Sequence, residues 1–231
     1  MRKLLSFALL AAIAVQASAQ SFTDGFESVT GLPANSASGV DVVSAVTWRA
    51  YNLSSPVGTT GWSFAPTTFT ANTGTGYISA NFNNTTGATG LINNWLMSPT
   101  LTFNNGDTIS FFTRTAEDTL WADRLRLALS LNGTSENSAD FSTILSVNEG
   151  LTVEGYPQVW TEFTATISGL SGPTTGRFAF NYNVPDAGPN GTNSNFIGID
   201  DVSYEAVPEP ATMAALAMGT LALLRRRKKA A

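Results

Sequence analysis

The chain has 231 residues, a net charge of −5, and neither cysteine nor histidine. The missing side chains exclude disulfide bonds, catalytic triads built on histidine and zinc sites with imidazole ligands. The excess of acidic residues argues against nucleic acid as a partner, because carboxylates and phosphates repel each other.

The first 19 residues have the three parts of a secretory signal peptide. Arg2 and Lys3 form a basic start, a largely apolar stretch covers residues 4–15, and Ala17-Ser18-Ala19 matches a small-residue cleavage site. We therefore expect cleavage after Ala19 and export of the remainder. Residues 1–19 should contribute nothing to the folded domain.

Residues 21–207 are more acidic than the chain as a whole. They contain no lysine, 16 acidic residues and five arginines, so their charge is 5 − 16 = −11. Their length, 207 − 21 + 1 = 187 residues, suits one domain with a substantial core. Such a surface favours divalent cations or neutral partners such as sugars. The arginines are Arg49, Arg114, Arg124, Arg126 and Arg177.

Short runs of alternating apolar and polar residues predict β-strands throughout this domain. Every second residue of 125–131 is leucine, and apolar side chains occupy every second position of 177–184. A period of two is typical of antiparallel strands with one buried face. Turn sequences such as Asn105-Gly106 and Asn132-Gly133 separate the runs. The pattern predicts an all-β fold, an antiparallel β-sandwich of the jelly-roll type.

Glu117, Asp118 and Trp121 form a candidate ligand-binding group in one predicted loop. An indole ring can stack on a sugar, and two nearby carboxylates could act as the acid and base of a glycosidase. The plainer interpretation is a solvated acidic loop in an acidic domain. Asp123 is expected to fix the start of the next strand.

The tryptophans divide by their sequence context. Trp95 lies in an apolar strand pattern and is expected in the core, whereas Trp121 is flanked by acids in a loop and is expected to be exposed. The pattern leaves the environments of Trp48 and Trp62 open.

Asp200 and Asp201 are unusual because they lie inside a predicted strand over residues 196–204. Strict alternation places Asp200 on the face of Val202 and Asp201 on the opposite face. The two faces are otherwise largely apolar. An inward carboxylate is costly unless it binds a cation, an arginine or hydrogen-bond donors.

A structural calcium site is one way to satisfy this pair. Ca²⁺ takes six to eight oxygen ligands, so Asp200 and Asp201 would need partners. Asp24 and Glu27 are the natural candidates, because the first and last strands of a domain often lie side by side. The alternative is that the carboxylates accept backbone N–H groups or pair with an arginine.

The last 25 residues combine three features in a fixed order. An apolar run over 211–224 could form a helix about 21 Å long, which is shorter than the ~30 Å hydrocarbon core of a membrane. The cations that follow should stay in the cytoplasm. A basic amphipathic helix on a membrane surface is the alternative. The run is preceded by Val207, Pro208, Glu209 and Pro210 and followed by Arg225, Arg226, Arg227, Lys228 and Lys229.

This tail resembles the PEP-CTERM sorting signal of Gram-negative bacteria. The resemblance implies that residues 207–210 are recognised by an exosortase, a membrane protease that removes the tail. It also implies transient anchoring in the inner membrane, followed by transfer to the cell surface or the exopolysaccharide matrix.

Three short motifs occur in a fixed order along the domain. They are Asp24-Gly25-Phe26-Glu27, Asn94-Trp95-Leu96-Met97-Ser98-Pro99 and Ile199-Asp200-Asp201-Val202. This ordered set resembles the choice-of-anchor J, or cleaved-adhesin-like, family. The resemblance implies a jelly-roll sandwich that is non-catalytic and, in some members, binds calcium. The region 33–48 departs from the family pattern.

Taken together, these features predict a signal peptide over 1–19, a sandwich domain over 20–206 and a sorting signal over 207–231. The expected function is an exported, non-enzymatic, adhesin-like or glycan-binding module at the cell surface or in the polysaccharide matrix. A structural matrix protein without a specific ligand is the first alternative. A carboxylate-based glycan hydrolase is the second.

Overall fold

A computed structural model describes residues 20–64 and 68–208. The predicted signal helix and the predicted membrane helix of the tail lie outside these residues. Within the described ranges, no helix has the length and hydropathy needed to span a membrane. Residues Gln20–Val207 form one compact unit.

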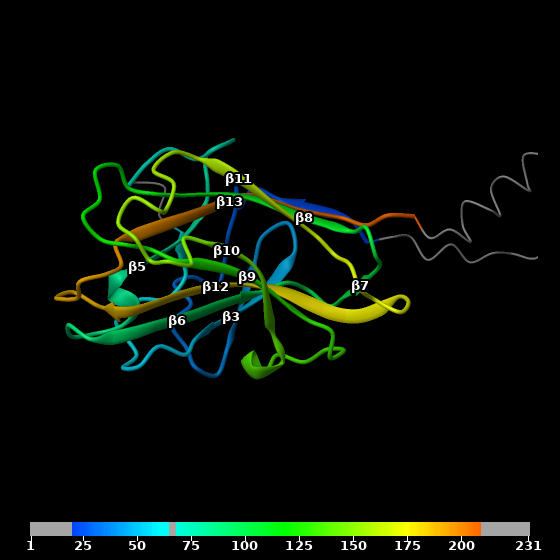
Figure 1. Ribbon diagram of the computed structural model, residues 1–231, viewed down its shortest axis with the longest axis horizontal. Coiled ribbons are helices and arrows are strands. Elements are labelled where there is room, and N and C mark those ends of the chain that lie inside the picture. The colour runs from blue at the N-terminus through cyan, green and yellow to red at the C-terminus, as the bar shows by residue number, and fades with distance from the viewer. Residues whose placement is uncertain (1–19, 65–67, 209–231) are drawn as a thin grey trace, which may run out of the picture. The chain divides into compact units, whose positions relative to one another are not determined.

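The described residues form two antiparallel sheets that face each other, with only two short 3₁₀ helices, η1 (Phe82–Asn84) and η2 (Ser138–Asp140) (Figure 1). The predicted all-β sandwich is confirmed. The six-stranded sheet consists of β11 (Thr161–Thr166), β8 (Thr108–Thr115), β13 (Phe196–Glu205), β5 (Ile78–Asn81) and β4 (Ser63–Phe64) in this order, with β1 (Phe22–Asp24) beside β13. The seven-stranded sheet consists of β10 (Ser142–Val147), β9 (Leu125–Ser130), β12 (Thr174–Ala187), β6 (Gly90–Met97), β3 (Thr47–Asn52) and β2 (Val40–Val43), with β7 (Leu101–Phe103) beside β12.

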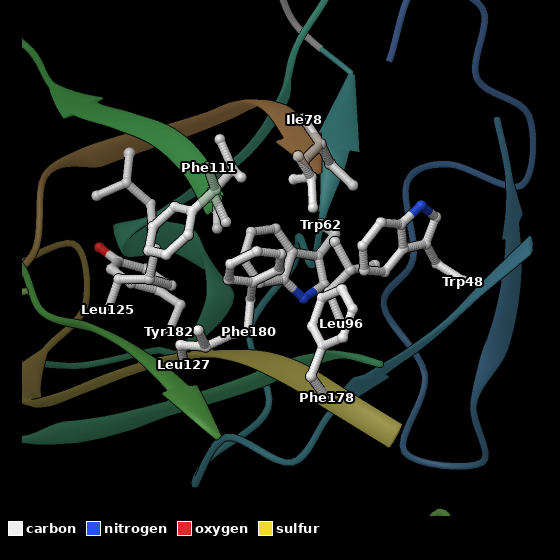
Figure 2. Close-up of a cluster of buried hydrophobic side chains, with 14 of the residues drawn as sticks. Trp48, Trp62, Ile78, Leu96, Phe111, Leu125, Leu127, Phe178, Phe180 and Tyr182 are labelled. Carbon is white, nitrogen blue, oxygen red and sulfur yellow. The ribbon is translucent and has the colours of Figure 1, made fainter. Parts of the chain in front are cut away.

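The core lies between the sheets and is built largely from aromatic rings (Figure 2). Alternation on β9 and β12 turns leucines and aromatic residues inward, as the sequence predicts. Phe178 packs edge-on against Trp48 at 5.7 Å, and Phe111 packs against Phe180 at 4.9 Å. The close contacts among these rings add to the hydrophobic stabilisation of the fold.

The tryptophans that the sequence left open, Trp48 and Trp62, are both fully buried in this core. Trp95 is also buried, but it lies on the outer face of the seven-stranded sheet, in a small cluster with Met97 and Ala179. Burial of Trp95 was expected, whereas its position outside the main core was not.

A β-bulge in β13 contradicts the predicted faces of that strand. Asp200 pairs with Phe112 and Ser203 with Ser110, so two residues of β13 oppose one residue of β8. Asp201 adopts a left-handed backbone with φ of +48°. The extra residue shifts the alternation by one position, as bulges do. Asp200 and Val202 therefore lie on opposite faces, and the core side chains of β13 are Ile197, Ile199, Val202 and Tyr204.

Candidate functional site

Three connections lie at the same end of the sandwich (Figure 1). Their residues line a hollow of about 220 Å³. The connections are the β8–β9 loop, the β12–β13 loop and η1, which follows β5. A hydrogen bond of 3.0 Å from Phe82 N to Asn195 O joins η1 to the β12–β13 loop. The lining residues are Phe82, Trp121, Gly188, Pro189, Ser194 and Asn195.

Trp121 is the exposed aromatic ring of this hollow, with 43% of its surface accessible. Its exposure agrees with the expectation from the sequence. The backbone around it is fixed, because Thr119 Oγ1 accepts from Trp121 N at 3.2 Å and donates to Trp121 O at 3.1 Å. Asn195 Nδ2 donates to the same hydroxyl at 2.9 Å. The backbone that carries the ring is therefore positioned before any ligand arrives.

Asp123 links the segments that surround the hollow. Its buried carboxylate accepts hydrogen bonds from Tyr182 Oη at 2.6 Å, Thr115 Oγ1 at 2.8 Å and Asn195 N at 3.0 Å. Burial raises the pKa of Asp123, and these donors oppose that rise. The carboxylate thus ties β8, β12 and the β12–β13 loop to the start of β9.

The β12–β13 loop that carries part of the lining has an unusual backbone. Asp186 and Ser194 adopt positive φ angles of 51° and 75°, which cost energy for residues other than glycine. Gly188 has φ of +118°, and a Cβ there would lie 2.5 Å from Gly87 O. The side chain of Ser194 is held by Tyr182 Oη at 2.7 Å. Strain of this kind is often found at binding sites.

The other two members of the predicted ligand-binding group lie outside the lining of the hollow. Glu117 forms an ion pair with Arg114 at 3.2 Å and is largely exposed. The backbone N–H of Asp118 donates to Gln158 Oε1 at 3.0 Å. Sequence reasoning missed Phe82, Ser194 and Asn195, which carry no local motif. The signal available was the Gly188-Pro189-Asn190-Gly191 turn sequence, which marks a loop but not its neighbours.

Asp24, the first of the predicted calcium ligands, interacts with protein donors instead. Its Oδ2 accepts from Trp48 Nε1 at 2.8 Å, and its Oδ1 accepts from Ser44 Oγ at 2.7 Å and from Phe26 N at 2.9 Å. Its side chain is buried. Asp24 therefore anchors β1 to the core, and both of its oxygens are already in use.

The remaining three carboxylates converge on Gly25. The position that a Cβ of Gly25 would occupy lies 3.4 Å from Asp201 Oδ1, 3.6 Å from Glu27 Oε1 and 3.9 Å from Asp200 Oδ1. Residues 72–75 donate hydrogen bonds to all three carboxylates. Across residues 20–64 and 68–208, no group of three or more acidic side chains is already arranged to hold a metal ion.

Asp200 should make the stability of the domain depend on pH. Burial raises the pKa of Asp200 from 3.8 to about 6, and the neighbouring charge of Asp201 adds to the rise. The folded state therefore binds this proton more tightly than the unfolded state does. The resulting stabilisation is complete below pH 3.8 and is lost as the pH rises through about 6.

Thermal melts between about pH 3.5 and 7 measure this effect. The melting temperature should fall as the pH rises from about 3.5 to 7, and Asp200→Asn should make this fall smaller. An unchanged slope in the variant would assign the pH dependence to other groups.

A comparison with protein families identifies the tail. A family model described as the PEP-CTERM protein-sorting motif matches residues 206–228. The chain carries a PEP-CTERM sorting motif. The resemblance seen in the sequence is thereby confirmed for this segment. A search of curated proteins gave no match.

Solved structures similar to the chain identify the fold of the domain. The K1 cleaved adhesin domain of Lys-gingipain from Porphyromonas gingivalis W83 aligns with a TM-score of 0.54 and 14% identity, covering 81% of this chain and 99% of that one. The K2 domain aligns with a TM-score of 0.51 and 19% identity, covering 81% and 98%. The K3 domain gives 0.52 and 15%, covering 81% and 100%. The domain that precedes the PEP-CTERM motif has the fold of a cleaved adhesin domain.

Proposed function

We propose that this PEP-CTERM protein is an exported, non-enzymatic module that binds a glycan at the Trp121 hollow. The observation that carries the proposal is an exposed indole ring at the wall of a hollow, on a backbone that hydrogen bonds to Thr119 hold in place. The C–H face of a sugar ring stacks well on such a ring. The side chains of Ser194 and Asn195 supply polar groups beside it.

The size and lining of the hollow restrict which ligands can bind there. Its volume of about 220 Å³ is below the ~300–1,000 Å³ typical of small-molecule pockets. One sugar ring, at a chain end or a branch, suits this space. None of the described residues that line the hollow is a carboxylate, which supports binding without hydrolysis.

A glycan array tests this proposal. Residues 20–207 should bind a defined subset of glycans, and Trp121→Ala should weaken that binding about tenfold or more, since tryptophan is a frequent binding hot spot and loss of a hot spot costs about 2 kcal/mol or more. Leu131→Ala is the matched control, because Leu131 has the same 43% exposure on another loop. Its binding should be unchanged. If neither wild type nor control binds any glycan, the function is structural and the proposal is wrong.

The sorting route is part of the same proposal. After signal peptide removal, the tail would anchor the protein in the inner membrane of a Gram-negative cell. An exosortase would then recognise residues 207–210 and release the domain to the cell surface or the polysaccharide matrix. The PEP-CTERM motif supports this route.

We further propose a structural Ca²⁺ ion near Gly25, held by Glu27, Asp200 and Asp201. The three groups offer only oxygen ligands, which Ca²⁺ prefers, and the raised pKa of Asp200 reflects a charge that burial and Asp201 destabilise. Asp24 is left out of this set, because its buried carboxylate already binds the Trp48 indole N–H and the Ser44 hydroxyl and anchors β1 to the core. The side chains would have to close around the ion.

Melting in calcium and in EDTA measures the contribution of the ion. Millimolar Ca²⁺ should raise the melting temperature by about 3 °C or more, and Asp201→Asn should abolish the rise. Glu154→Gln, which removes an exposed acid elsewhere, should retain it. Equal melting temperatures of the wild type in both buffers would rule out the site.

A further inference from the structure

Four of the five arginines in the described residues lie on one surface, the outer face of the seven-stranded sheet. Alternation places them there, because their strand neighbours fill the core on the other side. Arg49 lies on β3, Arg126 on β9 and Arg177 on β12, and Arg124 immediately precedes β9. We call this surface the arginine face.

The charge of the domain is strongly asymmetric as a result. The four arginines of the arginine face pair with three acids, Asp41, Glu136 and Glu149, which gives 4 − 3 = +1. The rest of the described chain has one arginine and 13 acids, which gives 1 − 13 = −12. An anionic partner is therefore repelled least near these ion-paired arginines.

The arginine face already binds carboxylates, although they belong to the protein itself. Arg126 donates two hydrogen bonds to the Glu149 carboxylate, from Nε to Oε2 at 3.1 Å and from Nη2 to Oε1 at 2.6 Å. Arg124 lies 3.7 Å from the same carboxylate, and Ser146 Oγ donates to it at 2.6 Å. Arginine recognises carboxylates best in this bidentate geometry. These contacts, Arg126 foremost, lower the pKa of Glu149 to about 2.

Glu149 is a solvent-exposed occupant of this site. It follows the edge strand β10, and 57% of its side chain is exposed to solvent. A carboxylate from outside can therefore approach the same guanidinium groups and compete with this loop residue. Asn183 lies beside the pair, where its Oδ1 accepts from Arg124 Nη2 at 2.7 Å. Its Nδ2 has no partner among the described residues and can reach a hydroxyl group.

We propose that the arginine face binds a carboxylate-bearing polysaccharide, with Arg124 and Arg126 contacting its carboxylates in place of Glu149. Charge complementarity selects an anionic partner, and the bidentate geometry selects carboxylates. A polymer with one carboxylate per sugar has fewer charges per unit length than double-stranded nucleic acid, so the −12 remainder of the domain repels it less. This surface is distinct from the Trp121 hollow and does not depend on it.

Binding to polygalacturonate, with dextran as the uncharged comparison, tests the inference on the exported protein purified from its cells. Polygalacturonate should bind at low salt and dissociate as salt rises, whereas dextran should not bind at this face. Arg126→Gln should weaken binding about fivefold. Glu149→Gln should strengthen it about fivefold, because the internal competitor is gone.

Two controls make the result specific. Glu162→Gln removes one negative charge from an exposed position on β11 and should leave binding within twofold of wild type. Trp121→Ala should also leave polygalacturonate binding intact, so failure of the hollow and failure of this face are separable. Equal binding by wild type and Glu149→Gln would overturn the inference. So would preference for single-stranded DNA over polygalacturonate, or self-association of the protein that Arg126→Gln abolishes.

Discussion

Asp123→Ala is expected to lower the free energy of unfolding by about 1–3 kcal/mol, because three segments lose their shared hydrogen-bond acceptor and Asn195 N is left without a partner. Thr115 Oγ1 keeps its contact with Phe196 O, and Tyr182 Oη keeps its contact with Ser194 Oγ. Tyr182 Oη, Thr115 Oγ1 and Asn195 N all donate to this carboxylate. Each unsatisfied buried group costs about 1–3 kcal/mol. Part of the cost is recovered because the carboxylate itself is buried and its removal relieves desolvation.

Urea unfolding of residues 20–207, followed by tryptophan fluorescence, measures this difference. Asp123→Asn keeps one carbonyl oxygen and should lose less than Asp123→Ala. Glu154→Ala, at an exposed position, should change stability by less than about 0.5 kcal/mol. A loss below 1 kcal/mol for Asp123→Ala would mean that water or a rearranged loop satisfies the donors.

Sorting is expected to remove every lysine from the mature protein. The chain has lysine at positions 3, 228 and 229 only. Cleavage after Ala19 removes Lys3, and cleavage within the PEP-CTERM motif removes Lys228 and Lys229. A mature chain then has a single primary amine, at its new N-terminus, whereas an unsorted chain has three.

Amine-reactive labelling of protein released from the cell surface, read by mass spectrometry, distinguishes the two forms. One label per chain is expected. A Pro208→Ala, Pro210→Ala double variant should accumulate in the membrane fraction with three labels, because its recognition motif is lost. Surface protein with three labels would show that the tail is retained and acts as a plain membrane anchor.

The sequence predicted most of the sandwich because half-buried strands carry a period of two. β9 and β12 show that period clearly, and their leucines and aromatic rings face the core. The strand β13 departs from this period. The bulge at Asp201 inserts one residue, and nothing in the local pattern marks the shift. The shortest strands, such as β4 with two residues, contain too little sequence to show a period.

The candidate site was only partly predictable for a different reason. Trp121 stood out because acids flank it in a loop, and its exposure followed. The hollow itself combines residues about 40–110 positions apart in the sequence, and only the paired sheets bring Phe82 and Asn195 together. Long-range contacts of this kind leave no trace in a single sequence.

The role of Trp121 is tested most directly by ¹H–¹⁵N NMR of residues 20–207, titrated with oligosaccharides released from the exopolysaccharide of the producing cells. The five indole N–H groups should give separate signals, since Trp48 Nε1 donates to Asp24, Trp95 Nε1 to Asn93 and Trp160 Nε1 to Thr70 O. Trp121→Phe assigns the signal of the exposed ring. Saturable movement of the Trp121 signal, with the other four unchanged, is the expected result. A Trp121 signal that stays fixed throughout the titration would contradict glycan binding at the hollow.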